Sequence, residues 1–217
     1  MTAFWGGTCK MKLALWLAIG YVFGSIPWGL VIGKVFYHKD IRNYGSGNLG
    51  GTNAARVLGT PVGILVIFLD AFKALLAMIL SHHVSPGYEQ YVGLAVCMGH
   101  CFPLFAGFKG GKAVACSYGY FLGLALYVTN EYLFTFILPI VFFFICLFLS
   151  KMVSLSSMIG VTSAAIGIFL FADKTVGLLV ACLALFVIYR HRANIDRIKK
   201  GTESKIGSRK AKSETVK

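Results

Sequence analysis

The chain has 217 residues, of which 57% are hydrophobic and only 13% are charged, and its mean hydropathy is +0.75. Soluble domains carry about a quarter charged residues, so this composition excludes an ordinary soluble protein and indicates an integral membrane protein. The net charge of +13 would suit a nucleic-acid partner, but the basic residues stand at the ends of apolar segments and in the C-terminal tail, so we expect membrane topology to explain them and no nucleic acid to bind.

Apolar segments predict seven transmembrane helices in an all-α bundle. The first resembles a signal peptide, but it is too long, and Pro27 and Lys34 stand where a cleavage site needs small residues. In it Gly20, Gly24, Gly29 and Gly33 should let a neighbouring helix approach closely. The predicted spans are 13–35, 61–81, 91–107, 113–129, 132–149, 153–172 and 175–189. We expect one polytopic domain, 1–206, with a basic and disordered tail, 207–217.

The distribution of basic residues predicts the orientation of the chain. With seven spans the termini lie on opposite sides, and 17 lysines and arginines fall on the side of the C-terminus against three on the other. The positive-inside rule then places the N-terminus outside and the C-terminus in the cytoplasm. Four polar stretches would lie at the cytoplasmic boundary, and we expect them to form one site. They contain Gly45, Lys112, Ser154 and His191.

The stretch 44–56 is the least membrane-like part of the chain before its tail. It has glycines at 45, 47, 50 and 51, hydrogen-bonding side chains and a final arginine. Glycine lets backbone N–H groups turn inward, and a guanidinium binds phosphate oxygens well, so the composition favours an anion site over a plain linker. The candidate side chains here are Ser46, Asn48, Asn53 and Arg56.

Two further stretches carry candidate chemistry. The run 107–112 delivers N–H groups and a lysine to the start of a helix, although alanines at 106 and 113 exclude a Walker A motif. Its phosphate-binding candidates are Lys109, Gly110, Gly111 and Lys112. In the run after Arg190, His191 and Asp196 have the spacing of a catalytic dyad, but we favour His191 and Asn194, because residues three apart share a helical face. The six cysteines show no metal-binding or redox spacing, and we expect neither a metal nor another cofactor.

Taken together, these motifs resemble the bacterial acyl-phosphate:glycerol-3-phosphate acyltransferase family of the PlsY type. The resemblance covers about residues 20–205 and rests on motifs in the same order. They are Gly24-Ser25-Ile26-Pro27, Gly45-Ser46-Gly47-Asn48-Leu49-Gly50 with Thr52, Asn53 and Arg56, Gly99-His100 with Pro103, Phe108-Lys109-Gly110-Gly111-Lys112, Val153-Ser154-Leu155, and Arg190-His191-Arg192 with Asn194, Ile195 and Arg197. Ala113 and Cys116 depart from the family, which usually has glycine and threonine there.

The resemblance implies an inner-membrane, multi-pass enzyme with its site on the cytoplasmic side. It would move the acyl group of acyl phosphate to the 1-hydroxyl of sn-glycerol 3-phosphate, giving lysophosphatidic acid and phosphate in the first step of phospholipid synthesis. Ser46, Arg56, Lys112, Ser154, His191 and Asn194 would line a pocket for phosphates, with His191, Asn194, Ser154 and Lys112 as the catalytic set. We expect a monomer whose partners are these two substrates and the lipid bilayer.

Two alternatives compete with this interpretation. Asp70 and Lys73, three apart in the middle of a predicted span, lie on one helical face, either as a structural pair or as a relay in a membrane anion transporter. A non-enzymatic scaffold would explain the basic tail but not the loops. The general base is also open: it is His191 or a phosphate oxygen of the acyl phosphate.

Overall fold

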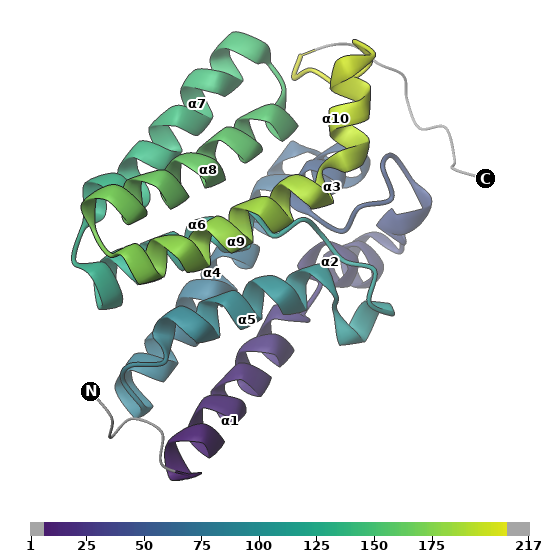
Figure 1. Ribbon diagram of the computed structural model, residues 1–217. Helices are drawn as coiled ribbons and strands as arrows, with labels where there is room; N and C mark the ends of the chain where they lie inside the picture. Colours follow the sequence, from purple (N-terminus) through teal and green to yellow (C-terminus); the bar gives the residue numbers. More distant parts are fainter. Residues whose placement is uncertain (1–6, 208–217) are drawn as a thin grey trace. The chain divides into compact units, whose positions relative to one another are not determined.

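The computed structural model describes residues 7–207, which form ten α-helices and no strand (Figure 1). They divide into two compact units. The first holds α1 to α5 and α6 as far as Gly123, and the second begins at Leu124 and holds α7 to α10. The helices are α1 Gly7–Gly24, α2 Trp28–Tyr37, α3 Gly51–Leu58, α4 Thr60–Val84, α5 Glu89–Cys101, α6 Val114–Leu124, α7 Leu138–Ser150, α8 Val153–Phe171, α9 Lys174–Arg190 and α10 Arg192–Lys199.

The first predicted span is not one continuous helix. It breaks into α1 and α2 at residues 25–27, because Pro27 has no N–H group to donate and disfavours helical geometry in Ile26 before it. The break leaves the carbonyl of Ile26 outside both helices, and the ammonium of Lys73 in α4 donates to it at 2.9 Å. A buried side chain therefore satisfies the polar backbone that the break exposes.

Glycines bring α1 and α5 into close contact, and the two helices lie side by side in Figure 1. A Cβ atom on Gly24 would overlap the carbonyl of Val96, and one on Gly99 would overlap the carbonyl of Tyr21. The predicted close approach of a neighbouring helix is confirmed for Gly20 and Gly24. Gly29 and Gly33 instead face the carbonyls of Leu49 and Lys39, in the segment after α2.

The sequence suggested that the glycine-rich stretch 44–56 is a loop, but only its first half is one. Its second half forms α3, which starts directly after Gly50 and packs against α4. The helix is short but buries Ala54 completely in a small apolar core with Ile41 and Leu49. A Cβ atom on Gly51 would lie 2.7 Å from the carbonyl of Gly63 in α4, so glycine here serves close helix packing.

The third predicted span is wrong at its C-terminal end. It was expected to reach residue 107, but α5 ends at Cys101, since Phe102 precedes a proline and leaves the helical conformation, with φ −128° and ψ 61°. A single 3₁₀ turn, Leu104–Ala106, follows Pro103. The helix is therefore only 13 residues long, about 20 Å at 1.5 Å per residue.

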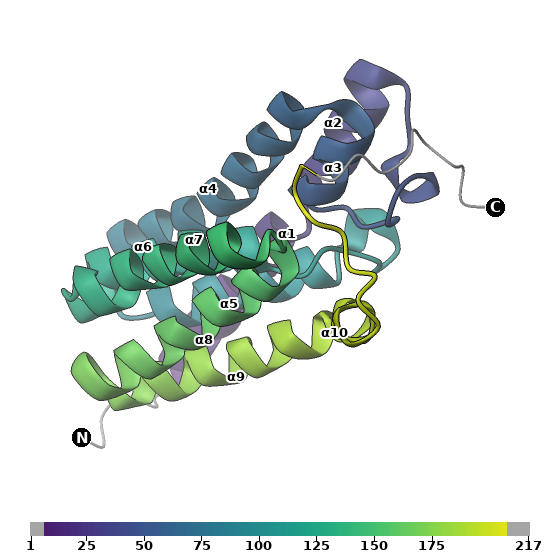
Figure 2. The same cartoon turned by 90° about the horizontal axis from the view of Figure 1, so that it is seen from above.

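In the second unit α7, α8 and α9 lie side by side in both views (Figures 1 and 2). Two π-helical segments, Ala125–Thr129 and Leu133–Ile137, flank the link to α7. Asp173 caps α9 by accepting from the backbone N–H of Val176 at 2.8 Å. The chain then bends by 58° at His191 into α10, a second short helix that the sequence did not predict.

The described residues support an all-helical integral membrane protein. Four helical stretches are long and apolar enough to cross a bilayer, namely 10–37, 60–84, 133–150 and 153–171. α9 with α10 would make a fifth if the bent pair counts as one span, and 114–129 is a shorter apolar helix. Seven spans and the orientation of the termini stay predictions. The predicted disordered tail lies outside the described residues, apart from Gly207.

Candidate active site

Asn53 organises the glycine-rich loop of the first unit. The side chain of this residue of α3 is only 2% exposed, and its amide donates to the carbonyls of Ile41 at 3.0 Å and Tyr44 at 3.2 Å. Its side-chain oxygen accepts from the N–H of Ser46 at 2.8 Å. Gly45 turns with a φ of 62°, and a Cβ atom there would overlap the Asn53 oxygen. One buried amide thus fixes the path of residues 41–46.

The loop presents its other candidate side chains outward. Ser46 and Arg56 are exposed, and the Arg56 side chain runs beside Gly45, where a Cβ atom would lie 3.1 Å from the Arg56 Cδ. Asn48 is half-buried, and its oxygen accepts from the N–H of Gly50 at 2.9 Å just before α3 begins. The first unit therefore exposes a hydroxyl on the loop and a guanidinium on α3 beside it.

The neighbouring Arg42 does not add a second cation to this loop. Its guanidinium binds the carboxylate of Asp40 twice, at 2.6 Å and 2.9 Å, and Lys34 lies 3.6 Å from the same carboxylate. The hydrogen bonds from Arg42 outweigh partial burial and lower the pKa of Asp40 to about 2. Asp40 is then charged at neutral pH and holds Arg42 in a local pair.

The run 107–112, which we call the second glycine turn, forms hydrogen bonds with the end of α5. The N–H of Gly110 donates to the carbonyl of Cys101 at 3.2 Å, and that of Gly111 donates to the carbonyl of His100 at 3.1 Å. These carbonyls have no partner within α5, because the last four of any helix lack one. The sequence suggested that the same two N–H groups cradle a phosphate. The structure instead gives them partners in the chain.

The cations of this turn lie on either side of the two glycines. Lys109 is exposed, and Lys112 is half-buried two residues before α6. Ala113, between Lys112 and the start of α6, has a φ of 61° and no exposed surface. Alanine is unusual there, because L-residues with a Cβ atom avoid left-handed geometry. The turn therefore enters α6 through a strained residue directly after its lysine.

In the second unit three candidate or neighbouring side chains meet at one carboxylate. Glu203 accepts from the hydroxyl of Ser154 at 2.7 Å and from the amide of Asn194 at 2.6 Å on one oxygen, and from Arg197 at 2.7 Å on the other. Burial raises the pKa of the Glu203 carboxyl, but these three hydrogen bonds outweigh it and lower the pKa below its ordinary value. Glu203 is therefore an anion that fixes two predicted catalytic side chains.

His191 stands at the bend between α9 and α10 and is 3% exposed. Its Nδ1 lies 2.8 Å from the carbonyl of Val187. A carbonyl only accepts, so Nδ1 carries a proton, and Nε2 is the nitrogen that can gain or lose one. The backbone of α9 thus orients His191 for proton transfer or for binding through Nε2. Asp196, the other member of the spacing that suggests a dyad, is exposed.

The structure brings the predicted residues together in two sets. Asn53, Ser46 and Arg56 belong to one loop and α3 in the first unit, while Ser154 and Asn194 share Glu203 in the second. The expectation that all polar stretches form one site stays a prediction.

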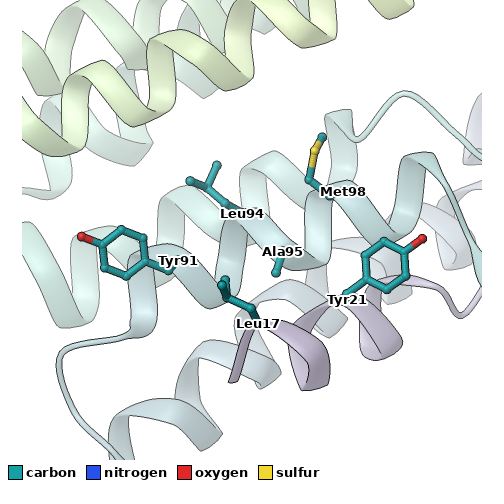
Figure 3. Close-up of a pocket in the computed structure, with 6 residues that line it drawn as sticks. All are labelled: Leu17, Tyr21, Tyr91, Leu94, Ala95 and Met98. Atoms are coloured by element: carbon teal, nitrogen blue, oxygen red, sulfur yellow. The ribbon is translucent and has the colours of Figure 1, made fainter. Parts of the chain in front are cut away.

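An apolar groove of about 400 Å³ lies between α1 and α5 in the first unit (Figure 3). Leu17 and Tyr21 line it from α1, and the remaining lining residues come from α5. These are Tyr91, Leu94, Ala95 and Met98. At one end the hydroxyl of Tyr21 donates to the carbonyl of Phe102 at 2.6 Å, just after α5 ends. The lining of this open groove is therefore apolar.

A protein-family model described as "Glycerol-3-phosphate acyltransferase" matches residues 14–201. The chain belongs to the glycerol-3-phosphate acyltransferase family. A relative of that name from Listeria monocytogenes serotype 4a is 48% identical over 200 residues, covering 90% of this chain and 98% of the relative. Another from Staphylococcus carnosus is 40% identical over 206 residues, with the same coverage of both chains.

Two solved structures of a family member resemble this protein. Both are crystal structures of PlsY, described as an integral membrane glycerol 3-phosphate acyltransferase. The glycerol 3-phosphate form matches with a TM-score of 0.82 and 32% identity, covering 90% of this chain and 96% of the other. The lysophosphatidic acid form matches with a TM-score of 0.79 and 30% identity. The family resemblance drawn from the motifs is confirmed, and with it an acyltransferase of phospholipid synthesis in a membrane.

Sequence reasoning on this family member missed Glu203. It is an isolated acid in a basic C-terminal segment, and it contacts Ser154 across 49 residues of sequence. The available signal was this lone negative charge among Arg197, Lys199, Lys200 and Lys205. A single acid amid cations is expected to be held by some of them or by nearby donors.

Proposed function

We propose that the chain transfers the acyl group of acyl phosphate to the 1-hydroxyl of sn-glycerol 3-phosphate. The hydroxyl oxygen attacks the acyl carbonyl carbon, the bond from that carbon to the phosphate oxygen breaks, and lysophosphatidic acid and inorganic phosphate leave. The observation that carries the proposal is the family match over residues 14–201, which spans every candidate residue. The glycerol 3-phosphate and lysophosphatidic acid forms of the PlsY structures support this acceptor and product.

The first unit supplies positive charge for phosphate. We assign Lys112, with Ser46, to the acyl phosphate, where an ammonium offsets the charge that builds on the leaving phosphate. Lys109 adds charge at the same turn. Gly110 and Gly111 contribute by letting the turn lie against the end of α5, since their N–H groups have carbonyl partners there. This replaces the cradle of free amides expected from the sequence.

Arg56 and the second unit serve glycerol 3-phosphate. A guanidinium holds phosphate through two parallel hydrogen bonds, and Arg56 is exposed and ready to do so. His191 and Asn194 orient the attacking hydroxyl, an effect that can contribute several kcal/mol, about 7–11 in favourable cases. Ser154 belongs to the same set through Glu203.

Two side chains take supporting roles under this proposal. Asn53 was a candidate for direct phosphate binding, but its amide is used by the backbone of the loop, so we assign it to holding Ser46 in place. Asn48 similarly supports Gly50 at the start of α3. Glu203 orients Ser154 and Asn194. The acyl chain would lie along apolar helix faces, and the groove between α1 and α5 is the one we assign to it.

We further propose that the protein works as a monomer in the inner membrane, with its N-terminus outside and its reactive groups at the cytoplasmic face. The excess of basic residues on that side supports this orientation. A site at a membrane surface also suits the two substrates, because glycerol 3-phosphate is water-soluble while acyl phosphate dissolves in lipid. Cysteine labelling from each side of the membrane would test the topology.

The deciding experiment gives the purified protein acyl phosphate and labelled glycerol 3-phosphate. Labelled lysophosphatidic acid with one equivalent of phosphate is expected. A matched reaction with an acyl thioester as donor should give none, since its leaving group has no phosphate for Lys112 and Ser46 to bind. Product from the thioester alone would refute the proposed donor. No observation favours the transporter, because Asp70 and Lys73 are paired with each other at 2.8 Å.

A His191→Ala variant tests the choice of general base. If Nε2 of His191 takes the proton, turnover should fall by about 100-fold or more. If a phosphate oxygen of the substrate takes it, turnover should persist and only the KM for glycerol 3-phosphate should rise. The family lacks an obvious histidine–aspartate dyad, and Asp196 is exposed, so we favour the second result.

A further inference from the structure

Three ionisable side chains outside the proposed site are buried together in the first unit. Asp70 and Lys73 of α4 are 1% and 3% exposed, and His100 of α5 is 7% exposed. The Lys73 ammonium lies 2.8 Å from the Asp70 carboxylate and 3.1 Å from Nδ1 of His100. Burying charges is costly even when they are paired, so a chain this apolar needs a reason to keep them.

Lys73 connects three groups in this cluster. Its ammonium forms hydrogen bonds with Nδ1 of His100 and with the carbonyl of Ile26 at 2.9 Å. It also forms an ion pair with the Asp70 carboxylate. Nδ1 of His100 also lies 3.4 Å from the Asp70 carboxylate, so the ring faces both charged groups of α4 on the same edge. Lys73 and Asp70 therefore fix the orientation of His100.

His100 in turn supports the second glycine turn. Its carbonyl accepts from the N–H of Gly111, and a Cβ atom on Gly111 would overlap Nε2 of its ring. A Cβ atom on Gly110 would overlap the His100 carbonyl. The turn thus lies directly on the ring and backbone of His100, with Lys112 as its next residue.

A metal would be an alternative reason for this cluster. The ligand atoms of Asp70, His100 and Cys116 all lie within 4.8 Å of one another. The ammonium of Lys73, however, is directed at two of these three groups and would repel a cation placed among them. The cluster is therefore a network of hydrogen bonds and charges.

We propose that His100 is a positioning residue for acyl transfer, held by Lys73 and Asp70 so that the turn at Gly110 and Gly111 presents Lys112 to the leaving phosphate. The expected change in kcat rests on the proposed function, whereas the expected change in the order of the turn does not. This role of His100 also explains why two charges persist in the middle of α4. They hold His100, on which the turn at Gly110 and Gly111 packs.

The test compares His100→Asn with His82→Asn as a matched control. Both histidines lie in the first unit beside a buried carboxylate, and His82 binds Glu89 at 2.8 Å, far along α4 from Lys73. Hydrogen exchange read by mass spectrometry on a peptide covering 107–112 should accelerate at least fivefold in His100→Asn and remain unchanged in His82→Asn. This readout needs no substrate, so it stands even if the proposed reaction fails.

Kinetics supply the second readout. His100→Asn should lower kcat with acyl phosphate at least tenfold and leave the KM for glycerol 3-phosphate within twofold, while His82→Asn leaves both unchanged. Unaltered exchange at 107–112, or an unaltered kcat in a variant with a lowered melting temperature, would overturn the proposal. If His100→Asn does not fold, Gly111→Ala displaces the turn from the other side of the same contact. It should show the same fall in kcat, and a normal kcat would again overturn the proposal.

Discussion

Removing the Glu203 carboxylate should lower activity, because Ser154 and Asn194 are no longer held in place, while the second unit stays folded. In Glu203→Ala the hydroxyl of Ser154 and the amide of Asn194 lose their acceptor while 6% and 7% exposed. Each buried donor left unsatisfied costs about 1–3 kcal/mol. The Arg197 side chain is 42% exposed, so water replaces its bond to Glu203, and that loss is only about 0.2–1 kcal/mol.

Two unsatisfied donors together are therefore expected to make the observed positions of Ser154 and Asn194 less stable by about 2–6 kcal/mol in Glu203→Ala. Glu203→Gln keeps one oxygen for these two donors but turns an N–H group toward Arg197, and it should cost about 1–2 kcal/mol. Because about 1.4 kcal/mol is a factor of ten in rate, kcat/KM should fall at least about 30-fold in Glu203→Ala and about 5- to 30-fold in Glu203→Gln.

The assay is steady-state formation of labelled lysophosphatidic acid, with melting temperatures measured on the same preparations. Glu131→Gln is the matched control, since Glu131 accepts from the N–H of Phe134 at 2.8 Å in the same unit but contacts no candidate residue. It should lose some stability and keep kcat/KM within twofold. The reasoning is refuted if Glu203→Ala keeps kcat/KM within threefold of the parent chain, or if Glu131→Gln loses as much activity.

Three further predictions concern pH, backbone strain and the apolar groove. The folded pKa of Glu203 is lowered, so its contribution to stability is complete above the ordinary carboxyl pKa and disappears as the pH falls through the lowered value. Melting temperatures between about pH 5 and pH 3 should fall more steeply for the parent than for Glu203→Gln. Ala113→Gly should melt within a few degrees of the parent, whereas Ala113→Val should melt well below it, since a β-branched residue fits poorly at a φ of 61°. Leu94→Trp should raise the KM for long-chain acyl phosphates and leave short-chain ones unchanged, and equal effects on both would remove the groove from the proposal.

Hydropathy predicted the helices well but not where they break. The centres of the spans follow from long apolar runs, and α4 and α8 match their predicted ranges to within three residues at each end. Breaks at Pro27 and Pro103 were missed because apolar residues continue on both sides of each proline, so hydropathy alone joins the segments. α3 was missed because Gly51, Thr52 and Asn53 lower the helix propensity of its first turn, while its stability comes from packing against α4.

The sequence indicated which polar residues are candidates, but it did not indicate which groups they bind. Polar groups in glycine-rich turns were all interpreted as ligands, yet Asn53 uses its amide on carbonyls 9 and 12 residues earlier. The N–H groups of Gly110 and Gly111 likewise satisfy the end of α5. Contacts of this kind depend on where an element ends, and element ends are what sequence patterns define least well. Glu203 lay beyond any periodic pattern, because it acts across 49 residues.

The 13 residues of α5 bear on how the protein sits among lipids. About 20 Å of helix is some 10 Å less than the thickness of a typical hydrocarbon layer. If α5 crosses the bilayer, as the sequence predicts, either the turn at its end lies beneath the headgroups or the surrounding leaflets thin to meet it. In both cases the depth at which a dissolved phosphate and a lipid tail can meet is set by the membrane itself. Turnover in vesicles of graded thickness should then be highest in the thinner ones.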